Sequence, residues 1–344
     1  MATISIAIAT YNRAGDLSRT LRGLEGIVFL DANAFEILVI DNRSTDGTRA
    51  VAEAFGSRFS GVFRYIYESR QGLSHARNRA VAEARHEVVA FLDDDVDVEA
   101  AWLLNLAKAY ESGDYAAVGG RAELVYPTER PAWLGSRDEG YLTKVELGDE
   151  RRRAAPDELY GVNLSVKKAW VERVGGFRGD LGRVGKCLIG SEETELLERV
   201  ESAGGAILYE PSAFVGHRVA PERLNRRWFW SRSFWGHRGD IRILADDQAS
   251  AYHFTRATWH IGLAGRDLAT ATIFNGPWGE EFFHQSRVFA SRVGIWVGYV
   301  DRLARRLRPG LAVKTLEPRG DEVGSSRTAM IAEHVELCVQ DTRR

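Results

Sequence analysis

Short apolar runs alternate with amphipathic helical patterns through the first 110 residues, and this alternation limits the fold more than any other feature of the chain. The runs 4–9, 35–40, 62–67 and 88–92 have the length and apolar content of buried strands. Helical spacing follows each run, in segments that begin near residues 17, 48, 73 and 102. Repeated strand–helix–strand units predict an α/β fold with a mostly parallel sheet and helices on both of its faces.

Polar residues follow each predicted strand, at the edge where such sheets bind their ligands. They occupy positions 10–13, 41–44, 68–72 and 93–95. No G-x-G-x-x-G sequence follows the first strand, and no P-loop motif occurs in the chain. The sequence therefore predicts a polar, carboxylate-containing site at this edge that is neither a dinucleotide-binding unit nor a P-loop.

Three adjacent carboxylates, Asp93, Asp94 and Asp95, follow the buried strand 88–92. Neighbouring carboxylates repel one another in a low-dielectric site unless a cation neutralises them. Mg²⁺ or Mn²⁺ is the natural partner of such oxygen ligands. In an extended chain Asp93 and Asp95 face the same side and can share one metal, while Asp94 points elsewhere. The alternative is a solvated acidic turn.

Other candidate residues are less specific when taken by themselves. Glu192 and Glu193 begin a helical pattern, and carboxylates there stabilise a helix N-terminus by about 0.3–1 kcal/mol each, so a structural role is the simpler interpretation. His217 follows a strand-like run and is equally consistent with a metal ligand and with a structural histidine. Asp41 directly follows a buried strand and is harder to explain as a helix cap.

The order of these motifs resembles that of family 2 glycosyltransferases, the inverting nucleotide-sugar enzymes of the GT-A fold. The resemblance covers roughly residues 3–218. It rests on Ala9-Thr10-Tyr11-Asn12-Arg13, the segment Val39 to Thr48, the segment Gln71 to Asn78, Asp93-Asp94-Asp95, and the segment Gly190 to Leu196. Each element alone is weak, whereas five in the family's order are a strong signal. The resemblance implies a GT-A core with a C-terminal helical extension.

The resemblance also implies roles for individual residues. Those implied to bind the nucleotide are Thr10, Tyr11, Arg13, Asp41, Gly72, Ala76, Arg77, Asp93 and Asp94. Asp41 commonly accepts a hydrogen bond from uracil in this family, which favours a UDP-sugar as the donor. Asp95 is implied to ligate Mn²⁺ or Mg²⁺ on the donor diphosphate, with Asp93 and His217 completing the metal set. Asn163 resembles a position near the donor sugar, and a structural asparagine at a strand edge is the alternative.

The acidic pair gains a catalytic interpretation from the same resemblance. An inverting transfer needs one carboxylate to take the proton from the acceptor hydroxyl. The family's base is the second acid of the pair, which is Glu193 in this chain. The family commonly has aspartate at that position, and the longer glutamate here keeps Glu192 as a rival.

We expect three parts along the chain. They are a GT-A catalytic domain at 1–218, a helical extension at 219–310 on the acceptor or membrane-surface side, and a partly mobile tail at 311–344. The catalytic domain is expected to consist of a nucleotide-binding half at 1–120 and an acceptor half at 121–218. The acceptor half is expected to contain a polar loop or lid at about 127–160, a strand at 160–166, and strands at 206–209 and 213–216 separated by a turn at Pro211.

Residues 223–242 interleave arginines with aromatic side chains. Such a segment suits an acceptor with negative charge, an anionic membrane surface, or packing against the catalytic core. The net charge of -2 does not fit a dedicated nucleic-acid binder. There is no apolar run of membrane-spanning length and no signal-peptide pattern, so we expect a cytoplasmic protein, alone or in peripheral contact with the inner face of the membrane. Cys187 and Cys338 fit neither a disulfide framework nor a zinc site.

These observations predict a metal-dependent inverting glycosyltransferase. It would move a sugar from a nucleotide-diphosphate donor to a hydroxyl of a glycan, a lipid-linked glycan or another acceptor in polysaccharide biosynthesis. One alternative is a nucleotidyltransferase on a similar sheet, but that class needs a glycine-rich loop ending in Lys or Arg, which residues 9–17 lack. The other is a non-catalytic carbohydrate- or lipid-binding module, which would be expected to have lost Asp95 or the acidic pair.

Overall fold

The computed structural model describes residues 2–27, 34–59, 61–185, 188–243, 251–277 and 279–307. The chain divides into two compact units. The first contains residues 1–181 and 191–228, and the second contains residues 182–190 and the chain from Phe229 onward. The predicted mobile tail at 311–344 and both cysteines lie outside the described residues.

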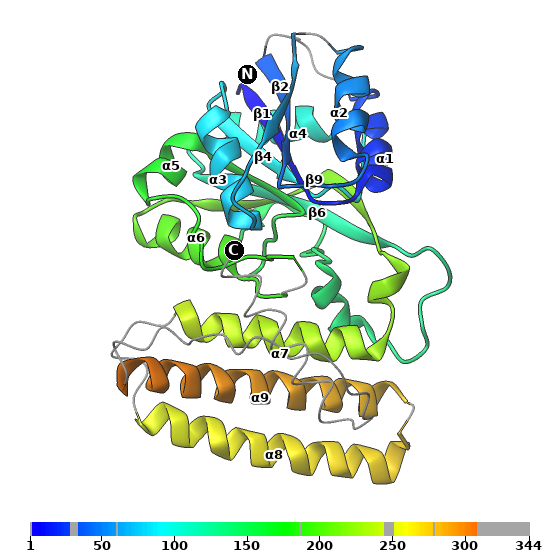
Figure 1. Cartoon of the computed structure of the whole chain (residues 1–344), viewed down its shortest axis with the longest axis vertical. Helices are drawn as coiled ribbons and strands as arrows, with labels where there is room; N and C mark the ends of the chain where they lie inside the picture. Colours follow the sequence, from blue (N-terminus) through cyan, green and yellow to red (C-terminus); the bar gives the residue numbers. More distant parts are fainter. Residues whose placement is uncertain are drawn as a thin grey trace, which may run out of the picture. The chain divides into compact units, whose positions relative to one another are not determined.

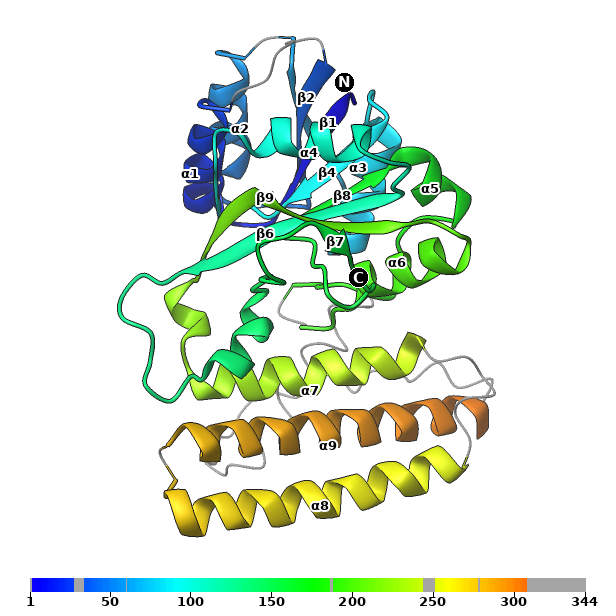
Figure 2. The ribbon, with the colours of Figure 1, turned by 180° about the vertical axis from the view of Figure 1, so that it is seen from behind.

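The first unit is built on one mixed sheet (Figures 1 and 2). Its strands are β1 (Ile4–Thr10), β2 (Phe35–Asp41), β3 (Phe63–Tyr67), β4 (Val88–Leu92), β5 (Val96–Val98), β6 (Ala117–Val125), β7 (Arg152–Arg153), β8 (Asn163–Lys167) and β9 (Ile207–Arg218). They follow the order β3-β2-β1-β4-β8-β6-β9-β5, and β7 pairs with β9. The pairs among β3, β2, β1 and β4 are parallel, as is β6 with β9, whereas β8 and β5 run antiparallel to their neighbours. The mixed, mostly parallel sheet implied by the resemblance is confirmed.

Helices flank this sheet as the alternating pattern predicts. They are α1 (Ala14–Leu24), α2 (Thr48–Gly56), α3 (Leu73–Glu83), α4 (Trp102–Glu111), α5 (Lys168–Arg173) and α6 (Glu192–Ser202), with short 3₁₀ helices η2 (Ser136–Leu142) and η3 (Pro221–Arg223). Helices α1 and α2 lie together on one side of the sheet and α3 lies on the other (Figures 1 and 2). Two layers of helices therefore bury both faces of the parallel strands.

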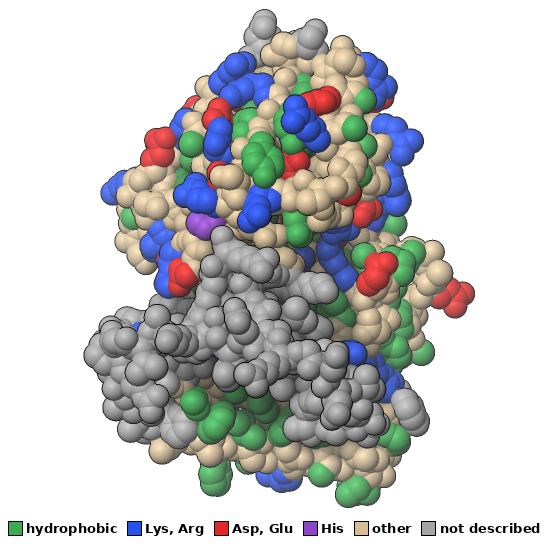
Figure 3. Space-filling view, in the orientation of Figure 1, with side chains coloured by type: hydrophobic (Ala, Val, Ile, Leu, Met, Phe, Trp, Pro, Cys, Tyr) green, Lys and Arg blue, Asp and Glu red, His purple; other side chains and the backbone are tan. Residues whose placement is uncertain are grey.

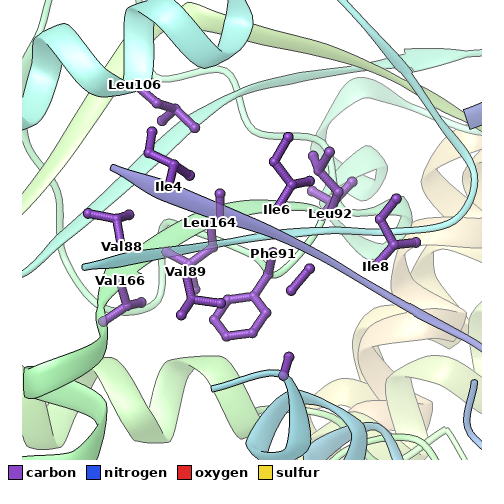
Figure 4. Packing of buried hydrophobic residues seen from close by; sticks show 14 of the residues in the cluster. Ile4, Ile6, Ile8, Val88, Val89, Phe91, Leu92, Leu106, Leu164 and Val166 are labelled. Atoms are coloured by element: carbon purple, nitrogen blue, oxygen red, sulfur yellow. The ribbon is translucent and has the colours of Figure 1, made fainter. Parts of the chain in front are cut away.

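The core is centred on β1 and β4, whose side chains alternate between the two faces of the sheet. Ile4, Ile6 and Ile8 are fully buried and point to the face on which Leu106 of α4 packs (Figure 4). Phe91 points to the opposite face (Figure 4) and meets Phe177 edge to face, with 5.4 Å between ring centroids. This packing fixes the end of β4, where the three aspartates begin.

Strand β9 corrects one prediction, because it is a single strand from Ile207 to Arg218 where the sequence predicts two strands and a turn. Its pairing with β6 shifts register between Gly120 and Ala122, opposite the interval that contains Pro211. Proline cannot donate a ladder hydrogen bond, so the irregularity accommodates it without ending the strand.

Strand β6 has no counterpart among the predicted strands, because Gly119 and Gly120 weaken its signal. A Cβ at Gly120 would lie 1.9 Å from the Ala213 carbonyl oxygen and 2.2 Å from Asn163 Nδ2. The glycine is therefore required by close packing inside the sheet. The expected loop at 127–160 is largely irregular and contains η2 and β7.

The second unit confirms the helical pattern predicted after residue 220. It contains most of α7 (Arg226–Ile243) together with α8 (Ala251–Asn275) and α9 (Glu280–Leu307). Phe229 and Phe283 meet edge to face at 5.4 Å between centroids, which joins α7 to α9. Among the described helices, none has the length and apolar character needed to cross a bilayer.

Helices α7 and α9 approach closely because α9 carries glycine at 294 and 298, one turn apart. A Cβ at Gly294 would lie 2.2 Å from the Phe234 carbonyl oxygen. We expect Gly294→Ala to push the two helices apart and to lower the free energy of unfolding of this unit by about 1–3 kcal/mol. Gly262→Ala is the matched control, because nothing lies within 4 Å of its added Cβ and alanine favours a helix. Urea unfolding followed by circular dichroism checks the pair, and equal effects of the two substitutions would contradict the packing argument.

Candidate active site

The residues that follow β1 and β4 meet at one edge of the sheet. Thr10 Oγ1 donates a 2.7 Å hydrogen bond to Asp94 Oδ2. Arg13 forms ion pairs with two aspartates, at 3.3 Å from Nε to Asp94 Oδ1 and at 3.0 Å from Nη1 to Asp95 Oδ2. Asp94 is therefore engaged by β1 and the start of α1, although Asp94 and Asp95 lie in a turn rather than in the extended chain that the sequence argument assumes. The structure brings Thr10 and Arg13, at and just after the end of β1, into contact with two aspartates that follow β4.

Asp93, Asp95 and His217 form a cluster that could hold a metal ion. Each offers one ligand atom, and these atoms all lie within 4.8 Å of one another. The cluster exists because Val96 pairs with His217 in the antiparallel β5–β9 ladder, which puts His217 beside the preceding aspartate. Two carboxylates and an imidazole suit a hard or borderline cation such as Mg²⁺ or Mn²⁺.

The contacts of His217 fit this interpretation. Its Nδ1 lies 2.8 Å from the Leu142 carbonyl oxygen and 3.1 Å from Thr143 Oγ1. A carbonyl can only accept, so Nδ1 carries a proton. Nε2 lies 3.3 Å from Asp95 Oδ1, on the side of the aspartates. Metal-binding histidines are usually oriented in this way, with one ring nitrogen donating to a carbonyl oxygen and the other facing the metal ligands.

Positive side chains compensate the charge of Asp95, which is buried. Burial alone would raise its pKa, but His217, Arg223 and Arg13 outweigh burial and hold the pKa well below its usual range. Arg223 Nη2 lies 3.3 Å from Asp95 Oδ2. Burial raises the pKa of Asp94 to about 7, with Asp95 adding to the shift and Arg13 opposing it. The cluster is therefore acidic, and Arg13 and Arg223 balance part of its negative charge.

Asp41, the last residue of β2, accepts hydrogen bonds from the protein itself. Asp41 is buried, its Oδ1 accepts a 2.7 Å hydrogen bond from the Ser44 amide, and its Oδ2 accepts one of 2.7 Å from the Tyr65 hydroxyl. The neighbouring Asn42 accepts from the Gly72 amide at 2.7 Å, which ties the loop after β2 to the start of α3. Recognition of a base by Asp41 stays a prediction, because both of its oxygens already accept bonds from the protein.

The remaining residues predicted to bind the nucleotide fall into two groups. Tyr11 has 38% of its surface exposed, which suits a ring that stacks on a base. Ala76 and Arg77 are buried, at 0% and 4% exposed. The Arg77 guanidinium lies near the rings of Phe91 and Phe177, at 5.9 and 5.7 Å from their centroids. Arg77 is therefore held inside the first unit.

Arg77 reaches the acidic pair at the start of α6. Its Nη1 lies 2.8 Å from Glu192 Oε1 and 3.6 Å from Glu193 Oε2. The Gly161 amide donates a 3.2 Å hydrogen bond to Glu193 Oε1. Among the described residues, no group donates a hydrogen bond to Oε2 of either glutamate.

The two glutamates differ in charge state. Burial, reinforced by Glu193, raises the pKa of Glu192 to about 7. Burial would also raise the pKa of Glu193, but Arg77 and the backbone amides outweigh it, so that this pKa lies below its ordinary value. Below about pH 7 the pair therefore holds one proton, and Glu192 is the more readily protonated of its two members.

Gly161 leaves space for the Arg77 guanidinium, since a Cβ at this position would lie 1.8 Å from Arg77 Nη2. We expect Gly161→Ala to displace Arg77 and to lower the free energy of unfolding by about 1–3 kcal/mol. Gly140→Ala is the control, because nothing lies within 4 Å of its added Cβ. Thermal unfolding measures the difference, and a Gly161→Ala protein as stable as the control would show that Arg77 has room to move.

Several residues at the site have no signal in the sequence. Leu142 and Thr143 hold the His217 ring, Tyr65 holds Asp41, and the Gly161 amide holds Glu193. Each acts from a distant segment, so only the tertiary structure could reveal it. Asn163 has a structural role, because it accepts from Trp102 Nε1 at 2.9 Å and donates to the Arg121 and Ala213 carbonyl oxygens.

Comparisons with known proteins agree with this geometry. Residues 5–172 match the model of the family described as Glycosyl transferase family 2. The chain is 28% identical over 278 residues to the succinoglycan biosynthesis protein ExoM of Rhizobium meliloti, covering 80% of this chain and 85% of the relative. It is 25% identical over 252 residues to the glucosyl-dolichyl phosphate glucuronosyltransferase of Haloferax volcanii, covering 72% of this chain and 79% of the relative.

Solved structures show the same fold at low sequence identity. The mannosyltransferase PcManGT from Pyrobaculum calidifontis, in complex with GDP-Man and Mn²⁺, has a TM-score of 0.54 at 16% identity, covering 98% of this chain and 81% of that one. GalNAc-T7 with UDP, GalNAc and Mn²⁺ has a TM-score of 0.53 at 15% identity, covering 91% of this chain and 58% of that one.

Proposed function

The chain is a family 2 glycosyltransferase of the GT-A fold, and from this premise we propose that it transfers a sugar from a nucleotide-diphosphate donor to a hydroxyl group with inversion at the anomeric carbon. The observation that carries the proposal is that the first unit contains two separate acidic clusters. One is the Asp93–Asp95–His217 set, and the other is the Glu192–Glu193 pair at the start of α6. The first suits a metal-bound diphosphate and the second suits proton transfer.

The metal set would hold Mn²⁺ or Mg²⁺ through Asp95, Asp93 and His217. When bound, such a cation supplies charge neutralisation for the departing diphosphate. Two neighbouring arginines add positive charge at the same place. Arg13 and Arg223 both contact Asp95, and their guanidinium groups are suited to bind phosphate oxygens.

Glu193 is the proposed general base. It is ionised near neutral pH, and no described residue donates to its Oε2. The Glu193 carboxylate would accept the proton of the acceptor hydroxyl as the hydroxyl oxygen attacks the anomeric carbon, on the face opposite the leaving diphosphate. Attack from that face inverts the configuration, so a single carboxylate base is sufficient.

We favour a UDP-sugar donor, on the resemblance at Asp41 and on the exposed Tyr11 ring. The solved relatives in fold contain either UDP or GDP-Man, so the base needs a direct test. The named relatives act in succinoglycan biosynthesis or carry the name of a glucosyl-dolichyl phosphate glucuronosyltransferase. We therefore propose a glycan or lipid-linked glycan as the acceptor, reached from the cytoplasm, with 223–242 as the segment to test for contact with acceptor or membrane.

A donor screen tests the proposal. Purified full-length protein would be mixed with UDP-, GDP-, dTDP- and CMP-sugars and Mn²⁺, and released nucleotide would be measured with and without lipid-linked or soluble glycan acceptors. We expect release from one nucleotide class, more with a suitable acceptor and none when EDTA removes the metal. NMR of the product would establish the anomeric configuration. A retained configuration would overturn the inverting mechanism, and release unaffected by EDTA would overturn the metal requirement.

A further inference from the structure

We propose that Arg77 is a positioning residue for proton transfer, which keeps Glu193 ionised while Glu192 carries the proton of the pair. This inference deepens the proposed function and rests on it. It assigns Arg77 to the acidic pair rather than to the nucleotide, and it gives the first glutamate a role distinct from that of the second.

The contacts of Arg77 direct its charge to the acidic pair, although its side chain also lines a small pocket with Phe91 and Asp93. Its side chain is 5% exposed, and it extends between Phe91 and Phe177 to the start of α6. Gly161 lies against its Nη2 side, where even a Cβ would collide with the guanidinium. One arginine therefore faces two buried carboxylates in a space closed by aromatic rings and by the backbone of residue 161.

The charge balance of this cluster requires one proton. A buried arginine can compensate one carboxylate, and a second ionised carboxylate beside it would remain uncompensated. Glu192 makes the direct 2.8 Å contact to Arg77, but only through Oε1, so its Oε2 can carry the proton. A protonated Glu192 is neutral, so Glu193, whose Oε1 accepts from the Gly161 amide, is the one charged carboxylate that Arg77 must balance. Glu193 then retains its negative charge and its basicity.

The charged groups that face the pair are few among the described residues. Arg77 comes from α3, and the adjacent carboxylates come from α6 itself. Asp93, at the end of β4, acts on Arg77 rather than directly on the glutamates. Because Asp93 belongs to the proposed metal set, pH profiles need saturating donor and metal so that its charge state is constant.

Two substitutions move the pH dependence in opposite directions. Arg77→Met removes the cation, so the acid limb of the kcat–pH profile should move up by about 1–3 pH units, with much of the rate recovered at high pH. Glu192→Gln removes the competing carboxylate and leaves Arg77 to Glu193 alone, so the acid limb should move down or vanish. Arg77→Lys keeps the charge without the planar fork and should fall between wild type and Arg77→Met.

The alternatives give different results. If Arg77 binds the donor diphosphate, Arg77→Met raises the donor KM and leaves the acid limb in place. If Arg77 only supports the fold, Arg77→Met lowers kcat by the same factor at every pH. Either result overturns the proposal. Should Arg77→Met fail to fold, the Glu192→Gln profile decides, since an acid limb that stays in place or moves up would also overturn it.

A measurement without substrate separates this inference from the proposed activity. The pKa of Glu192 is raised in the folded state, so its contribution to stability is present below about pH 4.5 and is lost as the pH rises through about 7. Urea unfolding of wild type should show this loss between pH 4.5 and 7, and Glu192→Gln should remove it. Asp94 titrates in the same range but is present in both proteins, so the difference isolates Glu192. No transfer by wild type with any donor would refute the function, whereas identical unfolding profiles would refute the protonation of Glu192 on which the Arg77 assignment depends.

Discussion

Replacing Asp95 with asparagine should abolish sugar transfer and Mn²⁺ binding together. Asp95 is the central member of the metal set, with His217 on one oxygen and both Arg13 and Arg223 on the other. Its low pKa makes it a fully ionised ligand at neutral pH. Loss of that charge removes several kcal/mol of stabilisation from the developing diphosphate, or about 10³-fold or more in rate. Mn²⁺ titration followed by electron paramagnetic resonance measures the binding without any substrate.

The matched control for this substitution is Asp97→Asn, two residues farther along the chain in β5. Asp97 is paired with Arg218 and has 56% of its side chain exposed, outside the metal set. The Asp97→Asn substitution should therefore leave Mn²⁺ binding unchanged. The fold of Asp95→Asn should survive, because Arg13 keeps its contacts to Asp94 and Asp16. Wild-type Mn²⁺ affinity in Asp95→Asn would rule out the metal assignment.

Glu193→Gln should lower kcat by about 10²–10⁴-fold while the donor still binds. The amide keeps the size of the side chain and can still accept from the Gly161 amide, but it cannot take a proton from the acceptor. Nucleotide-sugar binding measured by calorimetry, together with kcat from nucleotide release, separates the two effects. The same measurements on Glu192→Gln should show a much smaller loss at neutral pH.

An exposed glutamate of the same helix provides the reference for this pair. Glu198 lies one and a half turns beyond Glu193 in α6 and is exposed, so Glu198→Gln should have wild-type kinetics. A loss in Glu192→Gln larger than that in Glu193→Gln would exchange the roles of the two acids and make Glu192 the base.

Strands β1 to β4 could be predicted from the sequence, because each is a mostly apolar run closed by polar residues. The strands missed or misread are those whose pairing depends on partners. Gly119 and Gly120 hide β6 because glycine is a poor strand former in isolation, yet only glycine fits against Ala213 and Asn163. Pro211 suggests a turn, but a register shift keeps β9 continuous.

The candidate site also contains some residues whose placement could be predicted from the sequence and others whose placement could not. The Asp93–Asp95–His217 cluster could be predicted because its aspartates are only two residues apart and because His217 resembles a family position. The placement of Arg77 could not, since the motif that contains it suggests a nucleotide contact while its actual partners are about 115 residues away at Glu192. The proton balance of the glutamates also depends on burial, which no local pattern of residues records.

The irregular pairing of β9 has a consequence for how the length of this chain can vary. His217 lies at a ladder position opposite Val96, so its direction is set by the parity of the residues that separate it from the irregular stretch. A residue inserted between 211 and 214 can be absorbed where the register with β6 already shifts. A residue inserted between 215 and 217 would turn the imidazole to the opposite face of the sheet. Related sequences should therefore differ in length before Val215, and they should keep a constant number of residues between Val215 and His217.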